Sequence, residues 1–285
     1  MSTLLSFGHG YSARALTPRL LADGWRVIGT TRSDEKAEIL RSEGVEPVIF
    51  GDPLPLDQVT HVLTSAGPDG AGDPVLNQYR PVLEPDLGQM AWVGYLSTTG
   101  VYGDHGGGWV DEATPLTPST RRGEMRVQAE AAWHALAQQT GAPLHIFRLA
   151  GIYGPGRGPF AKVRAGTARR IVKPGQVFSR IHVEDIAQVL RASIARPNPG
   201  AIYNLCDDDP APPEDVIGHA AQLLGLPLPP AEDFDTAEMT PMARSFYAES
   251  KRVRNDRIKA ELGVRLRFPD YRAGLADLLR RESDI

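Results

Sequence analysis

The sequence has very little cysteine: Cys206 is the only one among 285 residues. A single cysteine excludes an internal disulfide bond. Because Cys206 directly follows a strand-like run at residues 201–205, we expect a buried thiol, with a reactive thiol as the alternative. The first residues also lack the basic stretch, apolar core and cleavage site of a signal peptide. Both absences are typical of a reducing compartment, so we expect a cytoplasmic protein.

Positive charge is not in excess, and long hydrophobic runs are missing. The chain has 31 Lys and Arg against 35 Asp and Glu, a formal net charge of −4. This balance argues against a nucleic-acid partner. No apolar run is long enough to span a bilayer, so we expect no membrane partner. We predict no metal site. The remaining composition, 41% hydrophobic and 23% charged, is ordinary for a globular protein.

A glycine-containing turn stands between an apolar run at residues 4–7 and a helix-like segment. Gly8 would let the chain turn, Gly10 would let the backbone approach a pyrophosphate, and the small Ala13 would let helix and strand pack closely. Free N–H groups at the start of the helix would face the phosphates. The pattern predicts a dinucleotide site, although a plain strand–helix turn remains the alternative. The residues that we assign to this turn are Gly8, His9, Gly10, Tyr11 and Ser12.

The end of the second expected strand, at residues 25–29, bears on the choice of cofactor. An acidic residue there would bind a ribose 2′-hydroxyl and select NAD. This chain instead has Thr31 and Arg32 after the strand. A guanidinium can bind a 2′-phosphate in a bidentate manner, which favours NADP over NAD. The alternative is that Arg32 is only a solvated loop residue.

Two further strand ends contribute candidate cofactor contacts. Asp52 follows the third expected strand, at residues 46–50, and is placed to meet an adenine amino group. A turn-forming aspartate is the alternative. The fourth expected strand ends at Ser65, Ala66 and Gly67, small residues that would let a cofactor lie across the strand tip.

Strands alternate with helices throughout the first half of the chain. This order predicts an α/β fold of the Rossmann type, a doubly wound parallel sheet with ligands at the carboxyl ends of the strands. Further along, we expect a short hairpin at 171–180, a helix at 183–195, an irregular loop at 227–242 and a basic helix at 250–262.

A cluster of hydroxyl groups follows the fifth expected strand, at residues 92–96. It includes Thr98 and Thr99, whose hydroxyls can hydrogen-bond a substrate carbonyl or alcohol. The next loop, at residues 105–116, is rich in glycine and contains Trp109. Its composition predicts a mobile flap over a pocket.

Several spaced motifs run through most of the chain in a fixed order. They are Thr98-x-x-Val101-Tyr102-Gly103, Asp111-Glu112-x-Thr114-Pro115-Leu116-x-Pro118, Arg148-x-x-x-Ile152-Tyr153-Gly154-Pro155, the run 180–187 and the run 202–205. Together they resemble the extended short-chain dehydrogenase/reductases, which include nucleotide-sugar epimerases, dehydratases and reductases.

The resemblance implies a catalytic Ser or Thr followed by a Tyr-x-x-x-Lys pair on a helix. The first of these falls on Thr98, but the Tyr and Lys positions hold Arg122 and Arg126. Arginine stays protonated at any working pH, so Arg122 cannot be the base. The chain therefore resembles an atypical branch. Arg126 would hold the nicotinamide ribose or a substrate anion, and the two arginines would form an anion site. A solvated helix face is the alternative.

The resemblance also suggests substrate contacts and leaves the proton donor unidentified. The candidate donors near the site are Tyr102, Tyr153, His105 and Glu124. The candidate substrate contacts are Thr99, Tyr102, Tyr153, Arg180 and His182. For His182, packing at a domain junction is the alternative.

The resemblance further implies a nucleotide-binding domain at residues 1–150, to which 183–205 return. Residues 151–182 and 206–285 would form a smaller substrate-binding portion. It also implies a homodimer through helices at 77–89 and 123–140.

These observations leave three functional hypotheses. The first is an NADP-dependent oxidoreductase that acts on a small or nucleotide-sugar-like carbonyl or alcohol, with an anionic or sugar-like substrate. The second is a catalytically inactive NADP-binding redox sensor or regulatory protein. The third is a sugar epimerase or dehydratase that uses NAD.

Overall fold

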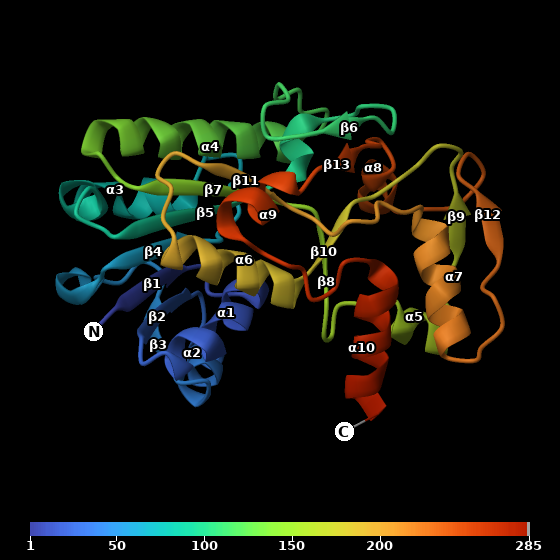
Figure 1. Ribbon diagram of the computed structural model, residues 1–285, viewed down its shortest axis with the longest axis horizontal. Helices are drawn as coiled ribbons and strands as arrows, with labels where there is room; N and C mark the ends of the chain where they lie inside the picture. Colours follow the sequence, from blue (N-terminus) through green and yellow to red (C-terminus); the bar gives the residue numbers. More distant parts are fainter. Residues whose placement is uncertain (284–285) are drawn as a thin grey trace.

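A seven-stranded parallel sheet forms the centre of the molecule (Figure 1), in the computed structural model that describes residues 1–283. Its order is β11-β7-β5-β4-β1-β2-β3, which confirms the predicted Rossmann-type fold. The strands are β1 (Thr3–Phe7), β2 (Arg26–Thr31), β3 (Glu46–Ile49), β4 (His61–Thr64), β5 (Trp92–Thr98), β7 (Leu144–Leu149) and β11 (Ile202–Leu205). Strands such as β1 and β7 are buried along their whole length, as expected in a parallel sheet that is covered on both faces.

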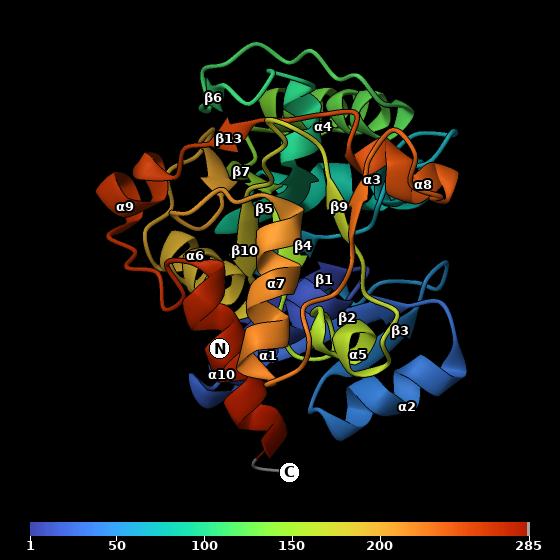
Figure 2. The ribbon, with the colours of Figure 1, turned by 90° about the vertical axis from the view of Figure 1, so that its right-hand side faces the viewer.

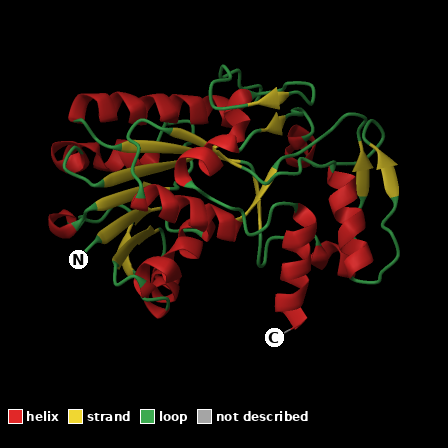
Figure 3. Ribbon diagram, in the orientation of Figure 1, coloured by secondary structure: helices red, strands yellow, loops and turns green. Residues whose placement is uncertain are grey.

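Helices cover both faces of this sheet (Figure 3). They are α1 (Tyr11–Ala22), α2 (Asp34–Ser42), α3 (Pro74–Leu87), α4 (Arg121–Thr140), α6 (Val183–Ala195) and α9 (Asp256–Leu262). Helix α1 packs against α6, and α3 packs against α4. Side chains fix where several helices begin: Ser33 caps α2, Asp73 caps α3 and Thr120 caps α4, each accepting a backbone N–H that would otherwise be unsatisfied.

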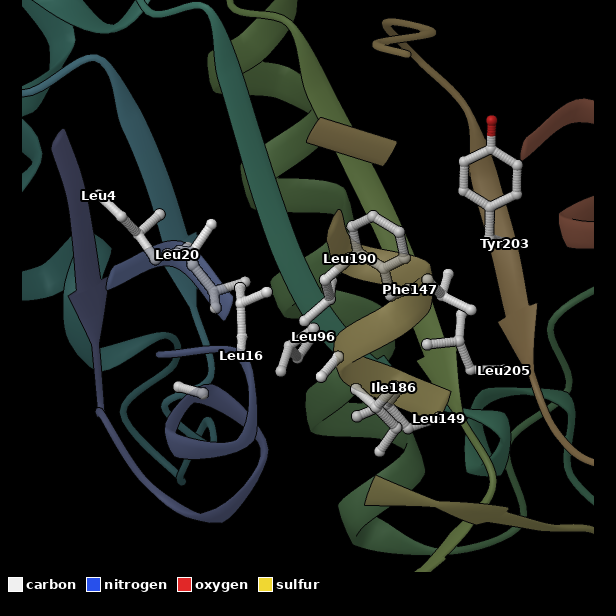
Figure 4. Packing of buried hydrophobic residues seen from close by; sticks show 14 of the residues in the cluster. Leu4, Leu16, Leu20, Leu96, Phe147, Leu149, Ile186, Leu190, Tyr203 and Leu205 are labelled. Atoms are coloured by element: carbon white, nitrogen blue, oxygen red, sulfur yellow. The ribbon is translucent and has the colours of Figure 1, made fainter. Parts of the chain in front are cut away.

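The largest apolar cluster joins α1 and α6 to the sheet (Figure 4). Leu16 of α1, Phe147 of β7, and Ile186 and Leu190 of α6 are all fully buried in it. The amphipathic pattern predicted a helix at 183–195, and α6 has those bounds. A second cluster packs α3 and α4 against the opposite face of the sheet.

A smaller portion lies beside the sheet, with α5, α7 and α10 toward the viewer in Figure 2. Its helices are α5 (Phe160–Arg164), α7 (Pro213–Leu223), α8 (Pro241–Phe246) and α10 (Tyr271–Ser283). Its strands are β8 (Gly151–Tyr153), β9 (Arg170–Val172), β10 (Arg180–His182) and β12 (Ala231–Asp233). The short elements η1 (Leu56–Gln58), η2 (Thr99–Tyr102), β6 (Trp109–Val110) and β13 (Arg252–Val253) complete the chain. None of the helices within residues 1–283 is long and apolar enough to cross a membrane.

The prediction of a hairpin at 171–180 is wrong. Strand β9 pairs in parallel with β12, and β10 pairs in parallel with β8. The two halves of the expected hairpin therefore take partners that are distant in sequence. The expected irregular loop at 227–242 contains β12 and the start of α8. These pairings depend on tertiary contacts, which a local turn signal does not reveal.

The basic helix expected at 250–262 begins only at Asp256. Ahead of it, β13 pairs in parallel with β6, and the backbone carbonyl of Ser250 accepts the N–H groups of His105 and Gly107. Hydrogen bonds to the glycine-rich loop thus replace the first helical turn. The same contacts correct the expected flap, because they fix the loop in place. Trp109 is 52% exposed and stacks with Arg254 instead of covering a pocket.

Candidate functional site

The glycine-containing turn has the backbone geometry that only glycine adopts easily. Gly8 has a φ of +66°, and a Cβ there would lie 3.0 Å from the backbone nitrogen of Ala66. The Gly8 N–H donates to Thr30 Oγ1 at 2.8 Å, and Ser65 Oγ donates to the Gly8 carbonyl at 2.6 Å. A Cβ at Gly10 would meet only the Gly8 carbonyl oxygen, at 3.5 Å. The turn is therefore held by its neighbours while its outer face stays open.

The N-terminus of α1 follows this turn and has no side-chain cap. Its N-cap residue is Gly10, and the first turn contains no acidic residue. Ser12 and Ala13 are buried beneath the turn. The unpaired N–H groups and the positive end of the helix dipole are thus left for an anion.

A cavity of about 410 Å³ opens beside the turn. It is lined by Gly8, His9, Gly10, Arg14, Thr30, Thr31, Arg32, Lys36, Ile39, Leu40, Phe50 and Ala66. The structure therefore brings together half of the residues predicted to contact the cofactor, from the ends of β1, β2 and β4, namely Gly8, His9, Gly10, Thr31, Arg32 and Ala66. Ser65 does not line the cavity, but its hydroxyl stabilises the glycine-containing turn by donating to the Gly8 carbonyl. Gly67 is exposed and follows Ala66.

Three basic side chains line this cavity. Arg32 and Lys36 are exposed, and neither has an ion-pair partner within the part of the chain that the structure describes. Arg14 is held by two hydrogen bonds to Glu43. Sequence reasoning missed Arg14 and Lys36. The available signal for Lys36 was its place in the first turn of α2, which begins directly after the end of β2.

Other lining residues set the polarity of the cavity. Burial lowers the pKa of His9 to about 4, so its ring is neutral near pH 7, and its Nε2 is 3.0 Å from Thr17 Oγ1. Ile39 is 41% exposed and faces the cavity with Phe50.

The expected contact of Asp52 with the adenine is not seen. The Asp52 side chain is exposed and does not line this cavity, and the Asp52 carbonyl accepts from the Tyr79 hydroxyl.

The positions of the family's catalytic set lie at the tip of β5 and the start of α4. Thr98 ends β5, is half-buried, and accepts the Gly100 N–H on its Oγ1 at 3.2 Å. Arg122 is exposed, whereas Arg126 turns inward. Arg126 Nη1 donates to the Tyr95 hydroxyl at 2.7 Å and to the Leu96 carbonyl at 2.9 Å. The two arginines therefore do not form one paired group.

Two arginines do approach the loop after β4. A Cβ at Gly67 would lie 3.8 Å from Arg126 Nη2, and one at Gly70 would lie 3.3 Å from Arg121 Nη2. Sequence reasoning chose Arg122 and missed Arg121, because the family alignment points to a position and not to the direction of a side chain. Cationic groups thus gather where the end of β4 meets the start of α4.

Two tyrosines expected at the substrate are structural. The Tyr102 hydroxyl donates to Asn204 Oδ1 at 2.8 Å and accepts from Arg148 Nη1 at 2.9 Å, and its side chain is fully buried. The Tyr153 hydroxyl donates to the Asp270 carbonyl at 3.3 Å, and burial raises the pKa of Tyr153 well above its usual range. Neither phenol is free to donate a proton to a substrate, which corrects both expectations.

His182 is also a packing residue, in agreement with the alternative for it. It is fully buried between the rings of Tyr153 and Phe268. Its Nδ1 accepts the Glu184 N–H at 3.2 Å, and burial lowers the pKa of His182 to about 4.

The remaining candidates lie around the tip of β5 and in β10. Arg180 is half-buried and donates to the carbonyls of Phe178 and Ala211, each at 2.9 Å. Thr99 lies in η2 and is 8% exposed. Among the other proton-donor candidates, His105 Nε2 is 3.1 Å from the Tyr102 carbonyl oxygen, and Glu124 is exposed.

Asp207 follows β11, and its carboxylate is buried. Burial raises its pKa from 3.8 to about 8, against the opposing charge of Arg180. The folded state therefore holds a proton that the unfolded state releases between these two values. Folding stability falls as the pH rises through this range, by up to about 1.4 kcal/mol per pH unit.

We expect Asp207→Asn to flatten this dependence, because the amide does not ionise. Urea unfolding at about pH 6, 7 and 8 should show the wild-type free energy of unfolding falling by roughly 1–2 kcal/mol, with little change in the variant. A parallel decline in both proteins would assign the effect to other groups.

Comparisons with known proteins support the fold. Residues 89–206 match the model of the NAD dependent epimerase/dehydratase family. Protein YeeZ of Escherichia coli (strain K12) is 29% identical, over 95% of this chain and 97% of that protein. A functionally unknown conserved protein from Silicibacter pomeroyi DSS is 62% identical over 99% of both chains, with a TM-score of 0.95. The dTDP-glucose 4,6-dehydratase of Bacillus anthracis str. Ames, solved in complex with NAD, is 16% identical over 100% of this chain and 97% of that chain, with a TM-score of 0.80.

Proposed function

We propose that this chain, in which residues 89–206 match the NAD dependent epimerase/dehydratase family, is an NADP-dependent oxidoreductase whose cofactor occupies the cavity beside the glycine-containing turn. The observation that carries the proposal is the pair of unpaired cations at this cavity. Arg32 and Lys36 face it from the end of β2 and from α2, and β2 ends in Thr31 rather than an acid.

The cavity suits the adenosine half of NADP. A 2′-phosphate would meet Arg32 and Lys36, which offer charge-assisted hydrogen bonds. Ile39 and Phe50 offer apolar surfaces to a flat base. The dehydratase of Bacillus anthracis was solved with NAD, and NAD remains the alternative cofactor here.

The proposed reaction places the substrate oxygen at Thr98 and an anionic group of the substrate at Arg126. A bound nicotinamide supplies or accepts the hydride. Arg126 would bind the anionic group through charge-assisted hydrogen bonds. Since Arg122 replaces the usual tyrosine and cannot donate and regain a proton near pH 7, the proton would come from solvent.

A fluorescence titration with NADPH, and with NADH in parallel, tests the proposal. We expect NADPH to bind at least about tenfold more tightly, since a 2′-phosphate adds charge-assisted contacts. Equal affinities would favour the NAD-dependent epimerase or dehydratase hypothesis. A lack of binding to either cofactor would overturn the oxidoreductase.

A second candidate function is a binding protein without catalysis, such as a redox sensor or regulatory protein. The observation that favours it is the exposed Arg122 at the position of the catalytic tyrosine. NADPH oxidation with a panel of small carbonyl compounds and carbonyl-bearing acids separates the two. Turnover would exclude the sensor, whereas tight NADPH binding without turnover on any of them would favour it.

The domain assignment and the homodimer belong to the same proposal. Residues 1–150 and 183–205 would form the dinucleotide domain, and 151–182 and 206–285 the substrate portion. A homodimer would form through α3 and α4, which pack side by side, with Val82 of α3 50% exposed.

A further inference from the structure

The turn between β8 and α5 contacts the start of α1, directly after the glycine-containing turn. The Tyr11 hydroxyl donates to the Pro155 carbonyl at 3.0 Å. Gly154 lies so close that a Cβ there would be 2.5 Å from the Tyr11 hydroxyl oxygen. Tyr11 is the first residue of α1, so this contact joins the candidate phosphate-binding backbone to the smaller portion.

The geometry of this second turn fixes the position of Arg157. The N–H of Gly154 donates to the Arg157 carbonyl at 3.1 Å, and the N–H of Arg157 donates to the Gly154 carbonyl at 2.9 Å. Gly156 has a φ of +69°, which favours glycine. The Arg157 guanidinium carbon lies 5.6 Å from the centroid of the Tyr11 ring. A cation–π contact therefore holds this guanidinium at the start of α1.

The positive charge of Arg157 and of the N-terminus of α1 is not neutralised by a neighbouring carboxylate within the described chain. Arg157 is exposed and has no ion-pair partner among residues 1–283. The start of α1 has neither a side-chain cap nor an acid in its first turn. Glu184, a carboxylate whose charge reaches Tyr11, is already paired with Arg19 and Arg281. An anion beside the glycine-containing turn would meet backbone N–H groups on one side and Arg157 on the other.

We propose that Arg157 binds the pyrophosphate of the dinucleotide and that the Tyr11 ring is the platform that positions it. This inference rests on the proposed function, because the pyrophosphate is the part of a dinucleotide that such a turn binds. Arginine suits this role, since its planar guanidinium can bind phosphate oxygens in pairs while it stacks on a ring. Cofactor binding would then tie the smaller portion to the dinucleotide site.

Arg157→Ala tests the inference with two probes, NADPH and adenosine 2′-monophosphate, which lacks a pyrophosphate. We expect the variant to bind NADPH about tenfold more weakly and to bind the monophosphate as the wild type does. Tyr11→Ala should weaken NADPH binding in the same selective way, because it removes the platform. Equal affinity of Arg157→Ala and wild type for NADPH would overturn the inference. An equal loss for both probes would do the same.

The matched control is Arg164→Ala. Arg164 is a half-exposed arginine of α5 that stacks on Phe160 at 5.7 Å and pairs with Glu282. Like Arg157, it is an arginine of the smaller portion that stacks on an aromatic ring, but it is ion-paired and does not stack on Tyr11, so we expect no change with either probe. Failure of the wild type to bind NADPH and NADH would overturn the proposed function itself. Normal wild-type binding with an unaffected Arg157→Ala would overturn only the role of Arg157.

Discussion

Glu130→Ala is expected to lower the free energy of unfolding by about 3–5 kcal/mol. Glu130 of α4 and Arg148 of β7 form a buried ion pair, and their side chains are only 5% and 4% exposed. Arg148 Nε and Nη2 donate to the carboxylate at 3.2 Å and 2.8 Å, and Ser97 Oγ donates to it as well. The alanine variant would leave a buried guanidinium without its counter-charge, and this accounts for most of the expected loss.

Urea unfolding measures this change against a matched surface pair. Arg80 and Glu84 of α3 form an exposed ion pair at 2.9 Å with i, i+4 spacing. We expect Glu84→Ala to cost only about 0.3–0.5 kcal/mol, because solvent screens exposed pairs. A similar small loss in both variants would show that the α4–β7 pair contributes little to stability.

Replacing both Arg32 and Lys36 with alanine is expected to weaken NADPH binding at least about 100-fold and to change NADH binding less than about threefold. Both side chains face the cavity without ion-pair partners in the described chain. These two side chains would contact only the 2′-phosphate, so their removal should leave the affinity for NADH, which lacks this group, almost unchanged.

Isothermal titration calorimetry with NADPH and with NADH measures this selectivity. Arg41→Ala is the control, because Arg41 lies on α2 with Lys36, is exposed, pairs with Glu38 and does not line the cavity. A comparable loss of NADPH and NADH affinity in the double variant would mean that these residues support the fold of the site and do not bind the 2′-phosphate.

Much of the dinucleotide site could be predicted because its signals are local. Gly8 and Gly10 stand between a buried strand and a helix, and the backbone adopts the turn that this order requires. Arg32 follows β2 directly, so its place at the cavity depends only on the strand and the helix beside it. Helix α6 is defined by its own amphipathic pattern.

The contributions of Lys36, Arg14 and Arg157 could not be read in the same way. Lys36 and Arg14 reach the cavity only once α2 and α1 pack beside β2. Arg157 meets Tyr11 although the two residues are far apart in the sequence. Contacts of this kind depend on how elements pack, and no local pattern encodes them.

The sequence by itself determined the alternation of strands and helices in the first half of the chain, the glycine-containing turn and the absence of the usual tyrosine and lysine. These features follow from backbone preferences and from residue identity at one place in the chain. Tertiary structure alone decided the roles of the polar residues around the strand tips. Tyr102, Tyr153 and His182 stand in family motifs, yet burial and hydrogen bonding occupy them in packing. Whether a polar side chain meets a ligand or a neighbour depends on what folds against it, and those neighbours come from distant parts of the chain.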